Sequence, residues 1–247
     1  MVSQLIPPPA FPGAAAPWPP EKGFPNWSAL IAKAQAAWDQ AAAGAAGPRV
    51  LIASNTGMHG AVSNLDSVLA AALTLRGAQV SRAFCDGILQ GCLIPTFGDA
   101  TPPEMIAERG LVQRLCKVCF NRGTHTHRPS GLGEHRLSRY LTAEDYAEVE
   151  ALVAALDADA IPGWTLDGMA IGEHAYAGAL RYFAKGNLDG EPLGEAVLRR
   201  YLEGAILTAR AYDRLLVGEQ PEVVVLHHGI YSPQGVAAEV CRKRGIR

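Results

Sequence analysis

Several features that would assign this 247-residue chain to a common class are missing from its sequence. No apolar stretch approaches the roughly 20 residues that a helix needs to cross a bilayer, so we expect no transmembrane segment. Lysine and arginine are scattered, and no basic run is interleaved with aromatic residues, which argues against nucleic acid as a partner. The pattern of a signal peptide is also absent. We therefore expect a cytoplasmic protein, and a peripheral position at the inner face of the membrane stays open.

The charge and apolar content are ordinary. Net charge is −2, charged residues make up 19% and apolar residues 49%, which is typical of a globular protein and favours no particular class of partner. Proline is the exception, because residues 1–25 contain eight of the 17 prolines. Such a segment cannot form a helix or a central strand, so we expect an extended arm. We place the arm and a leading helix in residues 1–48 and the main domain in residues 49–247.

The main domain alternates short apolar runs with amphipathic segments. A strand at 50–54, a glycine-containing loop, a helix at 63–76 and a strand at 78–84 form a βαβ unit, which requires a parallel sheet. The sequence therefore predicts an α/β fold with a Rossmann-like parallel sheet flanked by helices. The other predicted elements are a strand at 222–226 and helices at 27–43, 103–119, 171–183, 193–217, 233–244 and from Thr142 onward. Residues 85–135 are predicted to be an irregular, cysteine-containing insertion.

Two loops follow apolar strands at the edge where open parallel sheets bind ligands. The first, residues 55–60, is neither a dinucleotide fingerprint nor a P-loop, but its glycines let a ligand approach the backbone. His59 would act as general base; the alternative is a plain turn in which His59 caps the helix. The second loop, residues 227–231, is a candidate ligand site because of its two histidines. The alternative is that these histidines only form hydrogen bonds with neighbouring carbonyl groups. The predicted site residues on the two loops are Asn55, Gly57, His59, Gly60, His227, His228, Gly229 and Tyr231.

A further polar stretch lies in the predicted helix at 171–183. Glu173, Tyr176 and Arg181 would form a carboxylate, phenol and guanidinium set beside a polar ligand, and we include Glu173 among the predicted substrate-binding residues. A stripe of this kind is also typical of a packed helix surface, and that alternative stays open.

Four cysteines form two pairs, Cys85 with Cys92 and Cys116 with Cys119. The two-residue spacing of the second pair lets two sulfurs grip one tetrahedral ion at a turn, and the first pair could complete a site for Zn²⁺ or an iron–sulfur cluster. His125, His127 and His135 are possible substitute ligands. The alternative is that the cysteines simply pack in the core, as we expect for Cys241. A disulfide is less expected in the cytoplasm, and a thioredoxin-like use is disfavoured because Cys116–Cys119 closes the predicted helix.

Three segments resemble a known family: Asn-Thr-Gly-Met-His-Gly at 55–60, Pro221 to Gly235, and 172–183 together with Arg-Arg-Tyr-Leu at 199–202. They resemble the N-terminal half of two-domain (GT-B-like) glycosyltransferases of bacterial capsular or surface polysaccharide biosynthesis. The resemblance implies an acceptor-binding domain, His59 as the base, and a nucleotide-sugar donor bound mainly by a C-terminal domain that is missing from this sequence. The expected partners are thus a small-molecule or glycan substrate and a further domain or partner chain. The alternatives are a metal-binding protein that is not a transferase, or an interaction module.

Overall fold

The structure is a computed structural model that describes residues 25–89, 91–96, 101–108 and 112–247. The proline-rich arm, apart from Pro25, lies outside these ranges. The sheet has four parallel strands in the order β3-β2-β1-β4, formed by Gly133–Arg136, Gln79–Phe84, Arg49–Asn55 and Val223–Val225. The predicted Rossmann-like α/β fold is confirmed.

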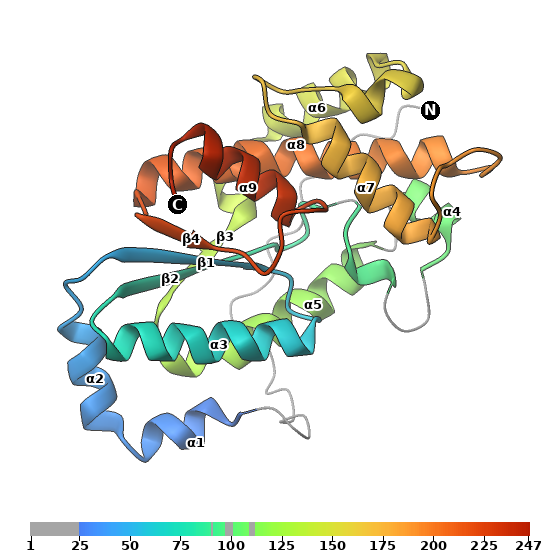
Figure 1. Cartoon of the computed structure of the whole chain (residues 1–247). Coiled ribbons are helices and arrows are strands. Elements are labelled where there is room, and N and C mark those ends of the chain that lie inside the picture. The colour runs from blue at the N-terminus through green and yellow to red at the C-terminus, as the bar shows by residue number, and fades with distance from the viewer. Residues whose placement is uncertain (1–24, 90, 97–100, 109–111) are drawn as a thin grey trace.

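Helices cover both faces of the sheet (Figure 1). On one side lie α3 (Gly60–Leu75) and α5 (Val112–His127); on the other lie α6 (Ala143–Ala155), α7 (Ile171–Phe183), α8 (Gly194–Glu219) and α9 (Gln234–Lys243). The alternation of β1 explains this arrangement, since Val50 and Ile52 pack with α3 while Leu51 and Ala53 join the larger core. The 26-residue helix α8 runs through that larger core. None of the helices in the described ranges combines the length and apolar character that crossing a bilayer requires.

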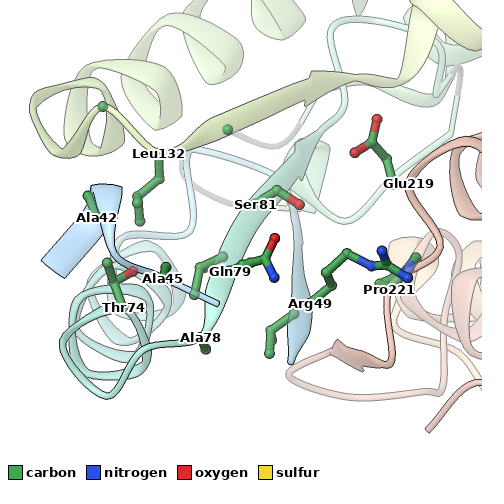
Figure 2. Close-up of a pocket in the computed structure, with 14 residues that line it drawn as sticks. Ala42, Ala45, Arg49, Thr74, Ala78, Gln79, Ser81, Leu132, Glu219 and Pro221 are labelled. Atoms are coloured by element: carbon green, nitrogen blue, oxygen red, sulfur yellow. The ribbon is translucent and has the colours of Figure 1, made fainter. Parts of the chain in front are cut away.

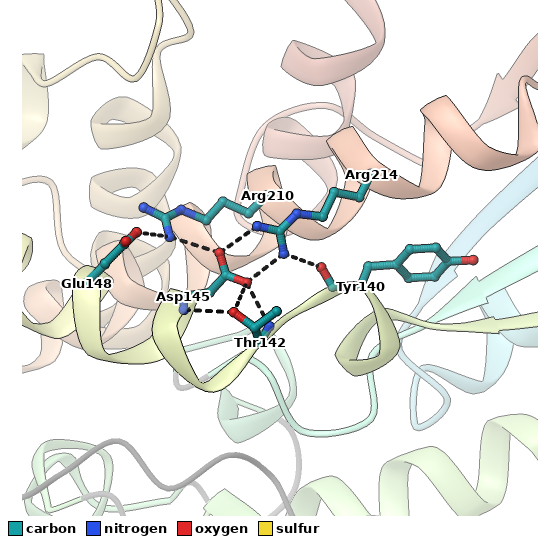
Figure 3. A network of polar contacts seen from close by, with 6 residues as sticks. All are labelled: Tyr140, Thr142, Asp145, Glu148, Arg210 and Arg214. Carbon is teal, nitrogen blue, oxygen red and sulfur yellow. Dashed lines mark hydrogen bonds and ion pairs between the residues drawn. The ribbon is translucent and has the colours of Figure 1, made fainter.

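The start of α6 shows how local sequence sets an element boundary. Thr142 and Asp145 form the capping box that their spacing predicts. Arg210 and Arg214 of α8 then donate to the Asp145 carboxylate at 2.6–2.9 Å, and Figure 3 shows this network with Glu148 and Tyr140. The cap of one helix is thereby tied to the central helix of the core.

Three predicted elements differ from the structure. The leading helix is split into α1 (Trp27–Ala32) and α2 (Gln35–Ala43). The helix predicted at 103–119 was wrong in extent, because α4 ends at Ala107 and α5 runs from Val112 to His127. The insertion is also less irregular than predicted, since its last part forms the edge strand β3 against β2. That strand has the sequence Gly-Glu-His-Arg, which carries no apolar alternation that could reveal it.

Candidate functional site

The sheet order places a topological switch point between β1 and β4. Strand β1 leads into α3 on one face of the sheet and β4 leads into α9 on the other face, so the chain leaves these two neighbouring strands in opposite directions. In open α/β sheets, the crevice at such a point, outside the carboxyl ends of the strands, is where ligands bind. The two loops predicted from the sequence are the ones that border it.

The structure brings the histidines of both loops together. The ring centroids of His59 and His227 are 6.3 Å apart, and those of His227 and His228 are 4.4 Å apart. Tyr231 follows at 5.2 Å from His228, and the guanidinium of Arg181 lies 4.9 Å from the Tyr231 ring and donates to its hydroxyl at 3.4 Å. We call His59, His227 and His228 the histidine cluster. Side chains from α7 and from both loops thus meet at one place.

Burial keeps two members of the histidine cluster uncharged. Burial, together with His228 and His59, lowers the pKa of His227 to about 4. Burial, Arg181 and His59 also lower the pKa of His228. Both imidazoles are therefore neutral at pH 7, and Arg181 is the positive charge that acts on His228.

His59 caps helix α3, as its alternative interpretation predicted. The backbone N–H of Val62 donates to His59 Nδ1 at 3.4 Å. An imidazole that accepts at Nδ1 carries its proton on Nε2, so in this tautomer His59 is a hydrogen-bond donor toward a ligand. His227 differs, because its buried Nε2 has no hydrogen-bond partner among the described residues. The geometry thus favours His227 over His59 as a proton acceptor.

The other predicted residues of the first loop face the protein. Asn55 is fully buried with a left-handed φ of 55°, its amide donates to the Ala53 carbonyl at 2.8 Å, and its Oδ1 accepts from the Tyr212 hydroxyl at 2.6 Å. Gly57 is buried against α5, where a side chain would overlap the backbone of Gly123. Gly60 is the half-buried first residue of α3.

Two predicted residues remain at the surface. Glu173 is exposed in the first turn of α7, and Gly229 is exposed between β4 and α9. It is the neighbouring His174 that joins α7 to the second loop, through a 2.8 Å contact between its Nδ1 and the Ile230 carbonyl. Tyr176 is half-buried. Of the proposed set of Glu173, Tyr176 and Arg181, only Arg181 has a described contact with the second loop.

The four predicted cysteines line a single cavity of about 20 Å³. Cys85 follows β2 directly, Cys92 lies on the connection beyond it, and Cys116 and Cys119 lie one turn apart on α5. The last pair was predicted to close its helix but lies inside α5, which continues to His127. Residues at positions i and i+3 of a helix lie on one face, so both side chains still point the same way. All four thiols are free, and the other lining residues are Thr56, Leu89, Ile94, Pro95 and Leu115.

The thiols are held in the protonated form. Burial raises the pKa of Cys85 to about 12 and also raises that of Cys92, Cys116 and Cys119. Neighbouring cysteines raise the pKa of Cys116 further, because several negative charges cannot share this cavity without compensation. Hydrogen bonds from the backbone and the charge of Arg122 lower the pKa of Cys119, but burial outweighs them.

Within the described ranges, no group of three or more histidine, cysteine, aspartate or glutamate side chains is arranged so that it could hold a metal ion. Four-thiolate coordination therefore stays a prediction. The three histidines proposed as substitute ligands do not line the cysteine cavity. His127 packs against Phe84 at 5.3 Å between ring centroids, and His135 contacts the Tyr140 hydroxyl at 2.9 Å.

A larger cavity of about 370 Å³ opens at the amino ends of the strands, and Figure 2 shows Arg49, Gln79 and Glu219 beside it. No predicted site residue lines it, and it lies at the sheet edge opposite the crevice. Two residues of interest were not among the predicted site residues. Arg181 belonged to a stretch that the sequence singled out, whereas Thr56 gave no signal beyond its place in the first loop.

No protein-family model, curated protein or solved structure matches this chain.

Proposed function

We propose that this chain is a glycosyltransferase, or the acceptor-binding half of one, that uses a nucleotide-sugar donor and a glycan acceptor. The observation that supports the proposal is the meeting of His59 and His227, from two loops 168 positions apart, at the switch point of the sheet. Nucleotide-sugars carry phosphate groups, and the guanidinium of Arg181 beside Tyr231 is a group that can bind an anion of this kind.

Two roles are needed for transfer, binding of the phosphate groups and acceptance of the proton from the acceptor hydroxyl. Arg181 is a donor that can bind phosphate or hydroxyl oxygens. His227 is the group that can accept the proton of an acceptor hydroxyl, since its Nε2 has no partner within the described ranges. A pKa near 4 makes a weak base, but an anion bound beside the imidazole raises its pKa toward neutrality. Donor binding would thus activate the base.

The test is nucleotide binding by the full chain. We expect UDP, GDP, CDP or ADP to bind with calorimetrically detectable affinity, and Arg181→Gln to weaken that binding about tenfold or more, since it loses a charge-assisted contact. His125→Ala is the matched control, because His125 lies on α5 and contributes nothing to the crevice. Where turnover is detectable, His227→Ala should lower it by about 10²–10⁴. Absence of binding to any nucleotide or nucleotide-sugar, or an equal loss in the control, would contradict the proposal.

The cysteine cavity favours a second candidate, a metal-binding protein that is not a transferase. The observation behind it is that four cysteines from three chain segments line one cavity. A chain that binds metal but no nucleotide would favour this candidate over the first.

A further inference from the structure

The cysteine cavity has features that side-chain packing alone does not explain. Its four cysteines come from the end of β2, the connection beyond it and helix α5. The backbone at Cys92 is also fixed from the core, because the Tyr201 hydroxyl of α8 donates to the Cys92 carbonyl at 2.8 Å. The fifth cysteine, Cys241, is equally buried but lies apart on α9. The four cysteines that form two pairs in the sequence line this cavity, and Cys241 does not.

Backbone donors already point at two of the sulfurs. Gly57 N–H donates to Cys119 Sγ at 3.2 Å, and Gly87 N–H donates to Cys85 Sγ at 3.4 Å. A sulfur carrying negative charge is a better acceptor than a thiol, so these amides are placed to stabilise thiolates. The positive charge of Arg122 acts on Cys119 in the same direction.

Thr56 provides an independent observation. Thr56 lines the same cavity and is 2% exposed, and its hydroxyl has no hydrogen-bond partner in the part of the chain that the structure describes. A buried hydroxyl without a partner costs free energy, and a bound ion is one of the partners that can satisfy it. Here the hydroxyl would meet a thiolate or an inorganic sulfide.

We propose that Cys85, Cys92, Cys116 and Cys119 are the four thiolate ligands of a thiophilic metal centre, either one Zn²⁺ ion or an iron–sulfur cluster. On binding, four S–H bonds break, the protons pass to solvent and four sulfur–metal bonds form, with no change in oxidation state of the protein. A single ion requires the thiols to turn inward from the cavity walls, because they are not arranged around one point. A cluster of several metal atoms accepts thiolates that are more widely spaced.

The same centre would hold the first loop of the crevice in place. Gly57, which donates to Cys119, lies two residues before His59, and its Cα packs directly against Gly123 of α5. Metal at Cys119 therefore anchors the loop that carries one member of the histidine cluster. The metal centre does not depend on the proposed transfer activity, since either can exist without the other.

The first measurement is the metal and sulfide content of the full chain purified without oxygen and, in parallel, after reconstitution with Zn²⁺ or with iron and sulfide. About one zinc per colourless chain, or iron with matching sulfide and a brown colour, supports the centre and identifies it. Each of Cys85→Ser, Cys92→Ser, Cys116→Ser and Cys119→Ser should lower the metal content about tenfold or more. Cys241→Ser should retain it, and is the matched control. A metal-free chain after every reconstitution, or equal loss in Cys241→Ser, overturns the proposal.

A second measurement avoids variants that fail to fold. In wild-type protein titrated with Cd²⁺, the sulfur-to-metal absorption should saturate at the intensity of four thiolates per ion, and two or fewer would overturn four-thiolate coordination. Hydrogen exchange then tests the anchoring: residues 55–60 should exchange about tenfold faster in the metal-free than in the loaded chain, while α8 is unchanged. Equal exchange in residues 55–60 would refute the anchoring role. Because none of these readouts involves a nucleotide, their failure is distinguishable from failure of the proposed function.

Discussion

His127 illustrates how a single buried residue makes this fold sensitive to pH. His127 is 1% exposed on α5, and neither of its ring nitrogens has a hydrogen-bond partner among the residues that the structure describes. Burial and the nearby charge of Arg82 lower its pKa to about 3, below the roughly 6.5 of an unfolded histidine. As pH falls from about 6.5 toward 3, the unfolded chain takes up a proton that the folded protein excludes. The free energy of unfolding therefore decreases over that range.

We expect His127→Leu to remove this pH dependence. The free energy of unfolding of the variant, minus that of the wild type, should be about 2 kcal/mol larger at pH 5 than at pH 8. The reason is that the unfolded wild-type chain binds a proton at His127 at pH 5 but not at pH 8. Urea unfolding at the two pH values measures the difference. At pH 8 His127 is neutral in both the folded and the unfolded chain, so the stability difference measured there is the internal control. The same stability difference at pH 5 and pH 8 would contradict the argument.

At the scale of elements, the capping network of α6 joins local and tertiary structure. Burial alone would raise the pKa of Asp145, but hydrogen bonds from Arg214, Thr142 and Arg210 outweigh it and lower the pKa well below its usual value. The folded pKa is thus below the unfolded value of about 3.9. The stabilisation is complete above that value and is lost as pH falls through the folded pKa.

Asp145→Asn should therefore destabilise the protein at pH 7 by about 2 kcal/mol, since two arginines lose a charged acceptor. The difference from wild type should shrink at pH 2, where more of the wild-type carboxyl is protonated. Denaturant unfolding monitored by circular dichroism at both pH values measures it. Glu148→Gln is the control, because its side chain is 65% exposed and the exposed pair with Arg210 contributes at most about 1 kcal/mol. A penalty for Asp145→Asn no larger than that of the control would contradict this account of Figure 3.

The elements also show where sequence patterns suffice. Helix α7 has the predicted bounds, and the capping box fixes the start of α6, because these signals lie within one or two turns of chain. Strand β3 was not predicted, since a four-residue polar edge strand is defined by its pairing with β2 and not by its own side chains. The cysteine pair at 116 and 119 was predicted to close its helix, but α5 continues to His127, because the polar residues after Cys119 gave no signal that the helix extends.

At the scale of the whole molecule, α8 is the element on which the larger core depends. Its buried residues contact α6, α7 and α9, and Ile206 at its centre is fully buried. Such a helix couples the layers on its side of the sheet, so we expect the main domain to unfold as one cooperative unit.

Ile206→Ala should lower the free energy of unfolding by about 2–5 kcal/mol through lost burial and the cavity left behind. Val217→Ala, on the same helix but 55% exposed, is the control and should change it by less than about 0.5 kcal/mol. Urea titration should show a single transition with an unchanged slope for both variants. Two transitions, or equal effects of the two variants, would show that α8 does not have this role.

Sequence patterns were enough to predict the parallel α/β architecture and the position of both histidine loops, because strand–loop–helix order is local and parallel strands share a carboxyl edge. Long-range packing is what brings Cys85 and Cys92 against α5, Arg181 to Tyr231, and the Tyr212 hydroxyl to Asn55. These contacts join residues from about 25 to more than 150 positions apart, and no local pattern encodes such distances. The tautomer of His59 likewise depends on its contact with the Val62 amide, which only the folded backbone sets.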